Sequence, residues 1–243
     1  MTPMTQPVPA PTPTVRRLCM GNEAIAIAAI AAGVNVACGY PGTPSTEIVE
    51  TIARLNPEGR VHVEWSTNEK AALELAAGAS YGGARVIMTC KQVGMNVASD
   101  PLMSLAYVGT RGGLVIVVAD DPGPISSQTE QDSRQFAQFA HVPVLDPATP
   151  EEAYAMTQAA FELSERYGTP VILRPTTRVD HGCASIEVPA DLGTLPVHEV
   201  PGFQKDPRFV IFPPLAHRAH GRMAADLAAI GREFCTSPFN ELS

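Results

Sequence analysis

Apolar and polar positions alternate in two patterns between Met20 and Pro175. Segments with the apolar spacing of a helix are followed by short apolar runs typical of strands. The predicted strands cover residues 34–40, 61–65, 84–90, 112–120, 142–146 and 169–175. The predicted helices cover residues 21–33, 43–55, a stretch beginning at Glu69, a helical or mixed segment at 97–109, a short helix near 132–140, and 150–168. This alternation, with right-handed crossovers, predicts an α/β fold with a doubly wound, mostly parallel sheet.

Helix-end signals refine these boundaries. Asn22 is placed to cap the first helix and Gly33 to end it, and Thr43 with Pro44 is placed to begin the second. For the helix at Glu69 two interpretations stay open. Ser66 and Glu69 have the spacing of a capping box, and the carboxylate could instead perform chemistry.

The pattern changes outside this region. Residues 1–17 are rich in Pro and Thr and are predicted to be a disordered leader, followed by the α/β domain at 18–179. Residues 180–214 are dense in Pro and Gly and are predicted to form an extended linker. Residues 215–243 are predicted to be a C-terminal helix and a truncated linker to a missing domain.

Composition excludes several classes of protein. The net charge of −8 and the absence of a basic run argue against a nucleic-acid binder. The longest apolar stretches are too short to span a bilayer, and the N-terminus lacks the apolar core of a signal peptide. A cytoplasmic protein without a membrane segment is therefore expected.

The absence of several known motifs also narrows the range of possible functions. The five cysteines are scattered, so reduced thiols are expected, with no zinc or iron–sulfur signature. The two common phosphate-binding loops, the G-x-S-x-G elbow and H-E-x-x-H are all absent. A hydrolase has no support in the sequence.

Candidate chemistry lies in the four segments that follow the first four strands of the predicted sheet. They read "GYPGTPST", "STNE", "KQVGMN" and "DDPGPISSQTEQDSR". Ligands bind at the carboxyl ends of the strands in open α/β sheets, so we expect all four segments to gather at one edge. Taken singly, each of the three glycine-containing segments can be interpreted without a function. "GYPGTPST" could be a capped turn, "KQVGMN" a solvated loop and "DDPGPISSQTEQDSR" a surface excursion. The pair Asp120 and Asp121 lacks the ligand spacing of a calcium site, and no metal is predicted there.

These segments, in this order, resemble the N-terminal part of the large subunit of indolepyruvate ferredoxin oxidoreductases. That group belongs to the thiamine-diphosphate-dependent 2-oxoacid:ferredoxin oxidoreductases. The resemblance covers about residues 18–243 and includes "GYPGTPSTEI", "STNEKAALELAAGASYGGAR", "KQVGMNVASDPLMSLAYVG" and "VVADDPGPISSQTEQDSRQFA". It implies that residues 18–179 are a pyrimidine-binding (Pyr) domain.

The resemblance also implies roles for single residues. Glu69 occupies the place of the glutamate that hydrogen-bonds N1′ of the aminopyrimidine and so promotes removal of the C2 proton of the thiazolium. It is the implied catalytic residue. The implied cofactor-binding residues are Gly42, Thr43, Glu69, Gln92, Gly94 and Asn96, and the implied substrate-binding residues are Tyr40, Thr43 and Lys91.

The chain departs from the family pattern in what it lacks. It contains neither the GDG…N magnesium motif of a diphosphate-binding domain nor a cysteine-rich ferredoxin-like segment. A partner region or chain is therefore expected to share the thiamine diphosphate and to carry magnesium and [4Fe-4S] clusters. The other implied partners are the smaller oxidoreductase subunit, ferredoxin, coenzyme A and a 2-oxo acid, in an oligomer.

The implied activity is decarboxylation of an aryl 2-oxo acid to an acyl-CoA with reduction of ferredoxin. Two alternatives remain. The chain could be a non-catalytic Pyr-like module for assembly or regulation, or an unrelated ligand-binding sheet in which Glu69 only caps its helix. The last alternative requires the four segments to lie apart in the structure.

Overall fold

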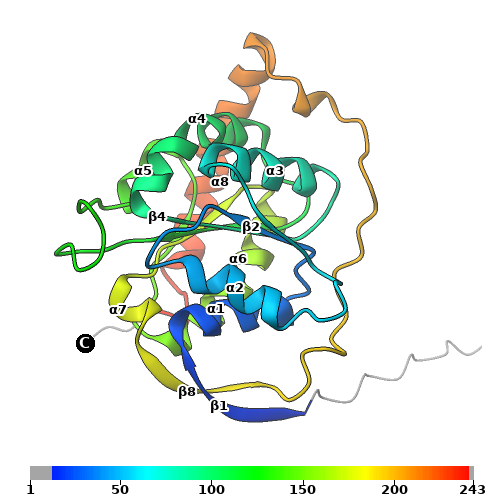
Figure 1. Ribbon diagram of the computed structural model, residues 1–243. Coiled ribbons are helices and arrows are strands. Elements are labelled where there is room, and N and C mark those ends of the chain that lie inside the picture. The colour runs from blue at the N-terminus through cyan, green and yellow to red at the C-terminus, as the bar shows by residue number, and fades with distance from the viewer. Residues whose placement is uncertain (1–12, 241–243) are drawn as a thin grey trace, which may run out of the picture.

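A six-stranded parallel sheet lies at the centre of the computed structural model, which describes residues 13–240 (Figure 1). The strand order is β3-β2-β4-β5-β7-β6, and every neighbouring pair is parallel. The strands are β2 (Val36–Gly39), β3 (His62–Trp65), β4 (Val86–Lys91), β5 (Leu114–Ala119), β6 (Val144–Leu145) and β7 (Val171–Leu173). The predicted α/β fold with a doubly wound, mostly parallel sheet is confirmed.

Helices cover both faces of this sheet. On one face lie α1 (Gly21–Ala31), α2 (Thr46–Arg54) and α6 (Pro150–Tyr167), and on the other lie α3 (Glu69–Tyr81), α4 (Gln92–Val108) and α5 (Arg134–Ala140). Successive strand residues join opposite cores. Ile87 packs with the α1 side and Met88 with the α3 side. Burial on both faces explains why the central strands are almost continuously apolar.

The direction of winding reverses between β2 and β4. The chain leaves β2 through α2 toward the edge strand β3, and it leaves β4 through α4 toward β5 on the other side. The carboxyl ends of β2 and β4 therefore border the topological switch point, where open α/β sheets bind their ligands.

Two predicted helix starts are wrong. Asn22 does not cap α1, whose N-cap is Met20; it is buried and donates to the Pro44 carbonyl (2.6 Å) and to Glu47 (2.9 Å). Thr43 does not cap α2, whose N-cap is Ser45 and whose first residue is Thr46. At α1 the Met20 nitrogen instead donates to the Glu23 side chain at 3.2 Å, while Asn22 ties the helix to the turn before α2.

An antiparallel ribbon of two strands lies outside the main sheet, and the sequence did not predict it. Strand β1 (Thr14–Met20) pairs with β8 (Cys183–Pro189), after the short helix α7 (Thr177–Asp180). Residues 14–17 are thus ordered, against the predicted leader, and the predicted linker contains a strand. The rest of the predicted leader, up to residue 12, lies outside the described residues.

The ribbon has a physical cause in α1. Residues 24–30 of this helix are all buried, so it cannot turn one face to water. The β1–β8 ribbon covers its side away from the sheet with Cys19, Ile186 and Val188.

After β8 the chain runs through residues 190–206, which we call the arm (right side of Figure 1). The arm turns at residues 192–195 and then continues without helix or strand to a 3-10 turn (Pro207–Phe209) and α8 (Pro213–Phe234). The arm is held to the domain by hydrogen bonds. Arg60 donates to the carbonyls of Leu192 and Leu195, and Asn35 donates to the His198 carbonyl at 2.8 Å. Gly33, with φ +75°, lets the arm pass, because a β-carbon there would lie 2.9 Å from the His198 nitrogen.

None of the helices described between residues 13 and 240 combines the length and apolar character needed to cross a membrane.

Candidate functional site

Glu69 is the first residue of α3 and is buried, with 7% of its surface exposed. The helix is capped by Asn68, whose side-chain oxygen accepts from the Ala71 nitrogen at 2.9 Å. The backbone nitrogen of Ser66 donates to the Gly39 carbonyl at 2.9 Å. The capping box of Ser66 and Glu69 is therefore wrong, and the Glu69 carboxylate is free for another role.

The Glu69 carboxylate packs against Gly94 in the first turn of α4. A β-carbon at Gly94 would lie 2.5 Å from Oε1 and 2.9 Å from Cδ of Glu69, so only glycine leaves room for the carboxylate. Within residues 13–240, Glu69 has no hydrogen-bond or ion-pair partner. No protein group in this range donates to the carboxylate, so it is available to a ligand that supplies a donor.

Lys91 lies at the end of β4 and crosses the turn that follows β2. A β-carbon at Gly42 would lie 3.0 Å from Lys91 Cδ, so the lysine stem rests on this glycine. Lys91 Nζ donates to Gln128 Oε1 at 3.1 Å. Tyr40 and Thr43, on the same turn, are exposed. The turn and Lys91 together therefore present an ammonium group, a phenol ring and a hydroxyl at one edge of the sheet.

The loop after β5 closes onto the same residues. Gln92 donates to the Thr129 carbonyl at 2.7 Å, and the Ser127 hydroxyl lies 3.4 Å from Gln92 Oε1 and 3.5 Å from the Thr43 carbonyl. The sequence did not single out Ser127, Gln128 and Thr129. Their only signal was the length and polarity of the loop.

Asp121 fixes the path of this loop. Its Oδ2 accepts from the backbone nitrogens of Ile125, Ser126 and Ser127 at 2.9, 2.8 and 2.7 Å, and its Oδ1 accepts from the Thr177 hydroxyl at 2.7 Å. Burial alone would raise the pKa of Asp121, but the hydrogen bonds from Ser126, Thr177 and the neighbouring amides hold that pKa below its usual value.

Asp120 is also engaged, by Ser133 and by the Arg174 guanidinium at 2.7 Å. In the described part of the chain, no group of three His, Cys, Asp or Glu side chains is placed to hold a metal.

Most of the predicted site residues meet at the switch point. Gly42, Glu69, Lys91, Gln92 and Gly94 adjoin, and the segment predicted as a loop from Gln92 onward is the start of α4. Asn96 is different, because it is exposed on the second turn of α4 and only its backbone carbonyl makes a hydrogen bond, from Ser99. The four segments do not lie apart, which contradicts the unrelated ligand-binding alternative.

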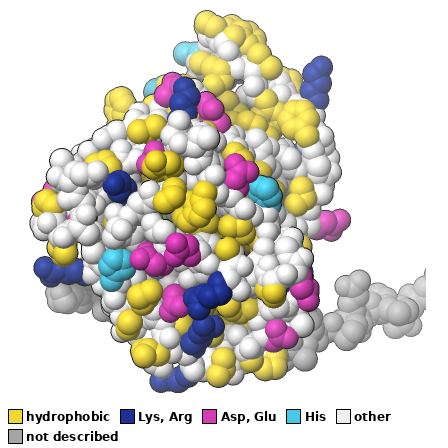
Figure 2. All heavy atoms as spheres, viewed as in Figure 1, with side chains coloured by type: hydrophobic (Ala, Val, Ile, Leu, Met, Phe, Trp, Pro, Cys, Tyr) yellow, Lys and Arg dark blue, Asp and Glu magenta, His cyan; other side chains and the backbone are white. Residues whose placement is uncertain are grey.

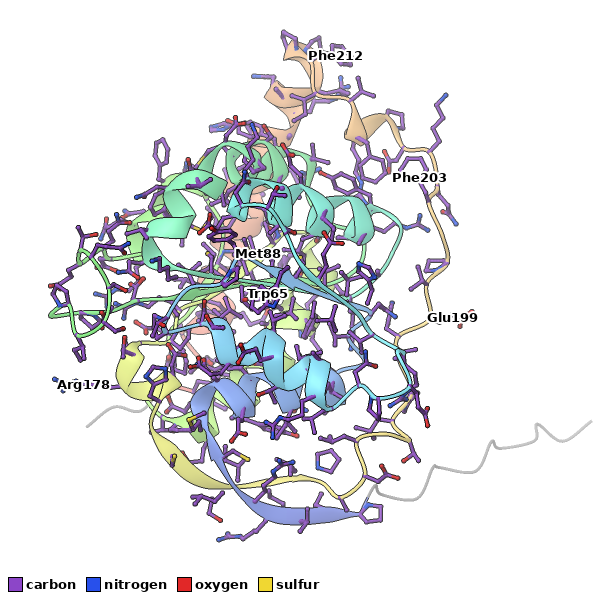
Figure 3. All side chains as sticks on the ribbon, in the orientation of Figure 1. Trp65, Met88, Arg178, Glu199, Phe203 and Phe212 are labelled. Carbon is purple, nitrogen blue, oxygen red and sulfur yellow. The ribbon has the colours of Figure 1, made fainter. Side chains whose placement is uncertain are left out.

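Figure 3 shows the labelled residue Trp65 between α3 above and α2 below, in the middle of the molecule. Figure 2 shows hydrophobic side chains at the centre of the same face, with acidic side chains beside them.

Residues 27–209 match the family described as pyruvate flavodoxin/ferredoxin oxidoreductase, thiamine diP-binding. The chain belongs to this family.

Known members resemble the chain over most of its length. It is 44% identical over 235 residues to the indolepyruvate oxidoreductase subunit IorA of Pyrococcus abyssi, covering 94% of this chain and 36% of that protein. It is 47% identical over 206 residues to the same subunit of Methanothermobacter thermautotrophicus, covering 84% of this chain and 33% of the relative. The chain thus spans about a third of the length of these relatives.

A more distant member is the 2-oxoglutarate synthase subunit KorA of Archaeoglobus fulgidus, at 32% identity over 216 residues, 83% of this chain and 58% of the relative. Among solved structures, 2-oxoglutarate:ferredoxin oxidoreductase from Magnetococcus marinus superimposes with a TM-score of 0.70 at 18% identity. The match covers 88% of this chain and 45% of that chain, and it supports the fold.

Proposed function

We propose that the chain is the pyrimidine-binding part of a thiamine-diphosphate-dependent indolepyruvate, or aryl 2-oxoacid, ferredoxin oxidoreductase. The observation that carries this proposal is the buried Glu69 carboxylate, which faces Gly94 at the switch point and has no partner among the described residues. A ring nitrogen that shares a proton with this carboxylate would satisfy it, and the glycine leaves the approach open. The site therefore fits an aminopyrimidine.

Each residue then has a role in the proposed reaction. Glu69 holds the proton at the pyrimidine N1′, while Gly42, Thr43, Gln92 and Gly94 line the ring, and Asn96 lies beyond them on the exposed face of α4. Lys91 and the Thr43 hydroxyl face the substrate carboxylate, beside Tyr40. When bound, thiamine diphosphate supplies the nucleophilic carbon that attacks the 2-oxo group and accepts the electrons released by decarboxylation. The products are an acyl-CoA, carbon dioxide and reduced ferredoxin.

The proposal requires a partner region or chain. The chain spans about a third of its indolepyruvate relatives and contains none of the common phosphate-binding motifs. We assign the diphosphate site with magnesium, the iron–sulfur clusters and the smaller subunit to that partner.

Glu69→Gln in the reconstituted complex tests the proposal. Glutamine keeps the size of the side chain but cannot exchange a proton, so ferredoxin reduction should fall by about a hundredfold or more while assembly persists. The matched control is Glu74→Gln on the same helix, where the side chain is 58% exposed. Near-normal turnover by the Glu69 variant, with the control also normal, would contradict the role of Glu69 and favour a non-catalytic module.

A further inference from the structure

Trp65 is the only tryptophan of the chain and ends the edge strand β3. Its side chain is 40% exposed, so much of the indole surface is not used by the fold. Figure 3 shows Trp65 near the middle of the molecule in this view. A large aromatic surface left open beside a functional edge is a feature of binding sites.

The backbone places Trp65 next to the turn that carries Thr43. Trp65 pairs in register with Gly39 of β2, and Tyr40 follows Gly39 directly. Alternate residues of a strand share a face, so Trp65 projects on the same side as Val63, which packs against the core formed by α1 and α2. The turn after Gly39 enters α2 on this side. The indole therefore flanks the turn.

In the sequence, Trp65 also lies close to Glu69. Only the corner Ser66–Asn68 separates the two residues. The Ser66 hydroxyl is buried and has no hydrogen-bond partner within the described part of the chain. The corner between Trp65 and Glu69 thus carries a buried polar group that lacks a partner among the described residues.

We propose that Trp65 is a specificity-determining residue that contacts the aromatic side chain of the 2-oxo acid, an inference that rests on the proposed function. A substrate whose carboxylate faces Lys91 and Thr43 extends its side chain away from the reacting carbon. An aryl ring that packs on the indole gains both apolar burial and aromatic pairing, and a small aliphatic side chain gains neither. Trp65 thereby selects aryl over aliphatic 2-oxo acids.

Trp65→Leu and Trp65→Phe in the reconstituted complex test this inference. The ratio of kcat/KM for indolepyruvate to kcat/KM for pyruvate should fall about tenfold in the leucine variant, because the flat ring is lost and an apolar group remains. The phenylalanine variant should retain more of the ratio. The control is Phe203→Leu, an aromatic residue of the arm that is 64% exposed and lies at the upper right of Figure 3.

Tryptophan fluorescence gives an independent readout. The difference between the spectra of the wild-type and Trp65→Phe complexes isolates Trp65, and this difference should change on adding indolepyruvate and not on adding pyruvate. An equal loss of kcat/KM for both acids, or no loss for either, overturns the role of Trp65 while leaving the proposed function intact. Absence of turnover with every 2-oxo acid in the wild-type complex overturns the proposed function, and this inference with it.

Discussion

Gly94 determines where the Glu69 carboxylate can lie. In Gly94→Ala the new methyl group would meet the Glu69 side chain from Cγ to Oε1, and this side chain must turn aside about its first torsion. We expect the free energy of unfolding to change by less than about 1 kcal/mol, because only a rotamer changes. Turnover of the complex should fall about a hundredfold, because the carboxylate no longer faces the ring.

Gly78→Ala on α3 is the matched control for that prediction, because nothing lies within 4 Å of a β-carbon there. It should stabilise the helix by about 0.5–1 kcal/mol and leave turnover unchanged. Thermal unfolding and ferredoxin reduction measure the two quantities. A Gly94→Ala variant with full turnover would show that Glu69 does not act from its observed position.

The five cysteine thiols differ in burial, with three buried and two exposed. Burial, and to a lesser degree the charge of Glu64, raises the pKa of Cys38 to about 12. Burial, followed by the charges of Glu69 and Asp120, raises that of Cys90. Cys183 and Cys235 are exposed and Cys19 is buried.

Because the thiolate is the reactive form, brief treatment of the native chain with iodoacetamide at neutral pH should modify Cys183 and Cys235 alone. Peptide mass spectrometry identifies the modified residues. Modification of Cys90 at a similar rate would mean that β4 opens readily.

Helix α3 depends on Asn68 for its start. Removing the cap in Asn68→Ala should lower the free energy of unfolding by about 1 kcal/mol. The neighbouring substitution Thr67→Ala serves as control, because Thr67 is exposed and is not the cap. Denaturant unfolding of both variants measures the difference. Equal stability of the two variants would contradict the cap.

The loop after β5 is predicted to depend on pH through Asp121. Its pKa lies below the ordinary value of about 3.9, so the ionised carboxylate stabilises the fold above that pH and the contribution is lost as pH falls through the folded pKa. The amides of Ile125, Ser126 and Ser127 should be protected from hydrogen exchange at neutral pH, and this protection, measured relative to an unstructured amide at the same pH, should be lost in acid.

In Asp121→Ala those amides should be unprotected at every pH, whereas Glu130→Ala, which removes one contact to Gly123 in the same loop, should leave them protected at neutral pH. Protection that persists in the Asp121 variant would assign the loop's order to other contacts.

Among the helices and strands, the sequence predicted the six strands of the main sheet but not the β1–β8 ribbon. Apolar periodicity reports local burial, and it located every strand of the parallel sheet. Strand β1 has two exposed apolar residues, Val15 and Leu18, and its partner β8 follows only after residue 180. Such long-range pairing leaves no local pattern. The one signal in the sequence was the first helix itself. Its residues 24–30 are all Ala or Ile, so a further layer must cover it.

The molecule as a whole is expected to carry only half of the cofactor site. We therefore expect the isolated chain to bind thiamine diphosphate weakly. Isothermal titration of thiamine diphosphate into the isolated chain should give an affinity well below that of the reconstituted complex, because the chain lacks a phosphate-binding motif. Glu69→Gln should weaken binding to the complex further. Equal affinity of the isolated chain and the complex would contradict a shared site.

The candidate site was predictable where parallel strands impose it. Residues that follow β2 and β4 must meet, because these strands are neighbours and end at one edge, so Gly42, Lys91 and Gln92 come together without further information. The contacts of Ser127 and Thr129 could not be predicted, since they depend on how Asp121 folds the loop. Whether Glu69 caps its own helix was decided by Asn68, which outcompetes Ser66 for that task.

The ribbon has a consequence for synthesis of the chain. Because Thr14 pairs with Pro189 and Met20 with Cys183, β1 leaves the ribosome long before its partner is made. Until β8 emerges, the outer side of α1 stays uncovered, and exposed apolar surface of this kind invites aggregation or chaperone binding. The parallel sheet can assemble first, and the ribbon closes over α1 as a late step of folding.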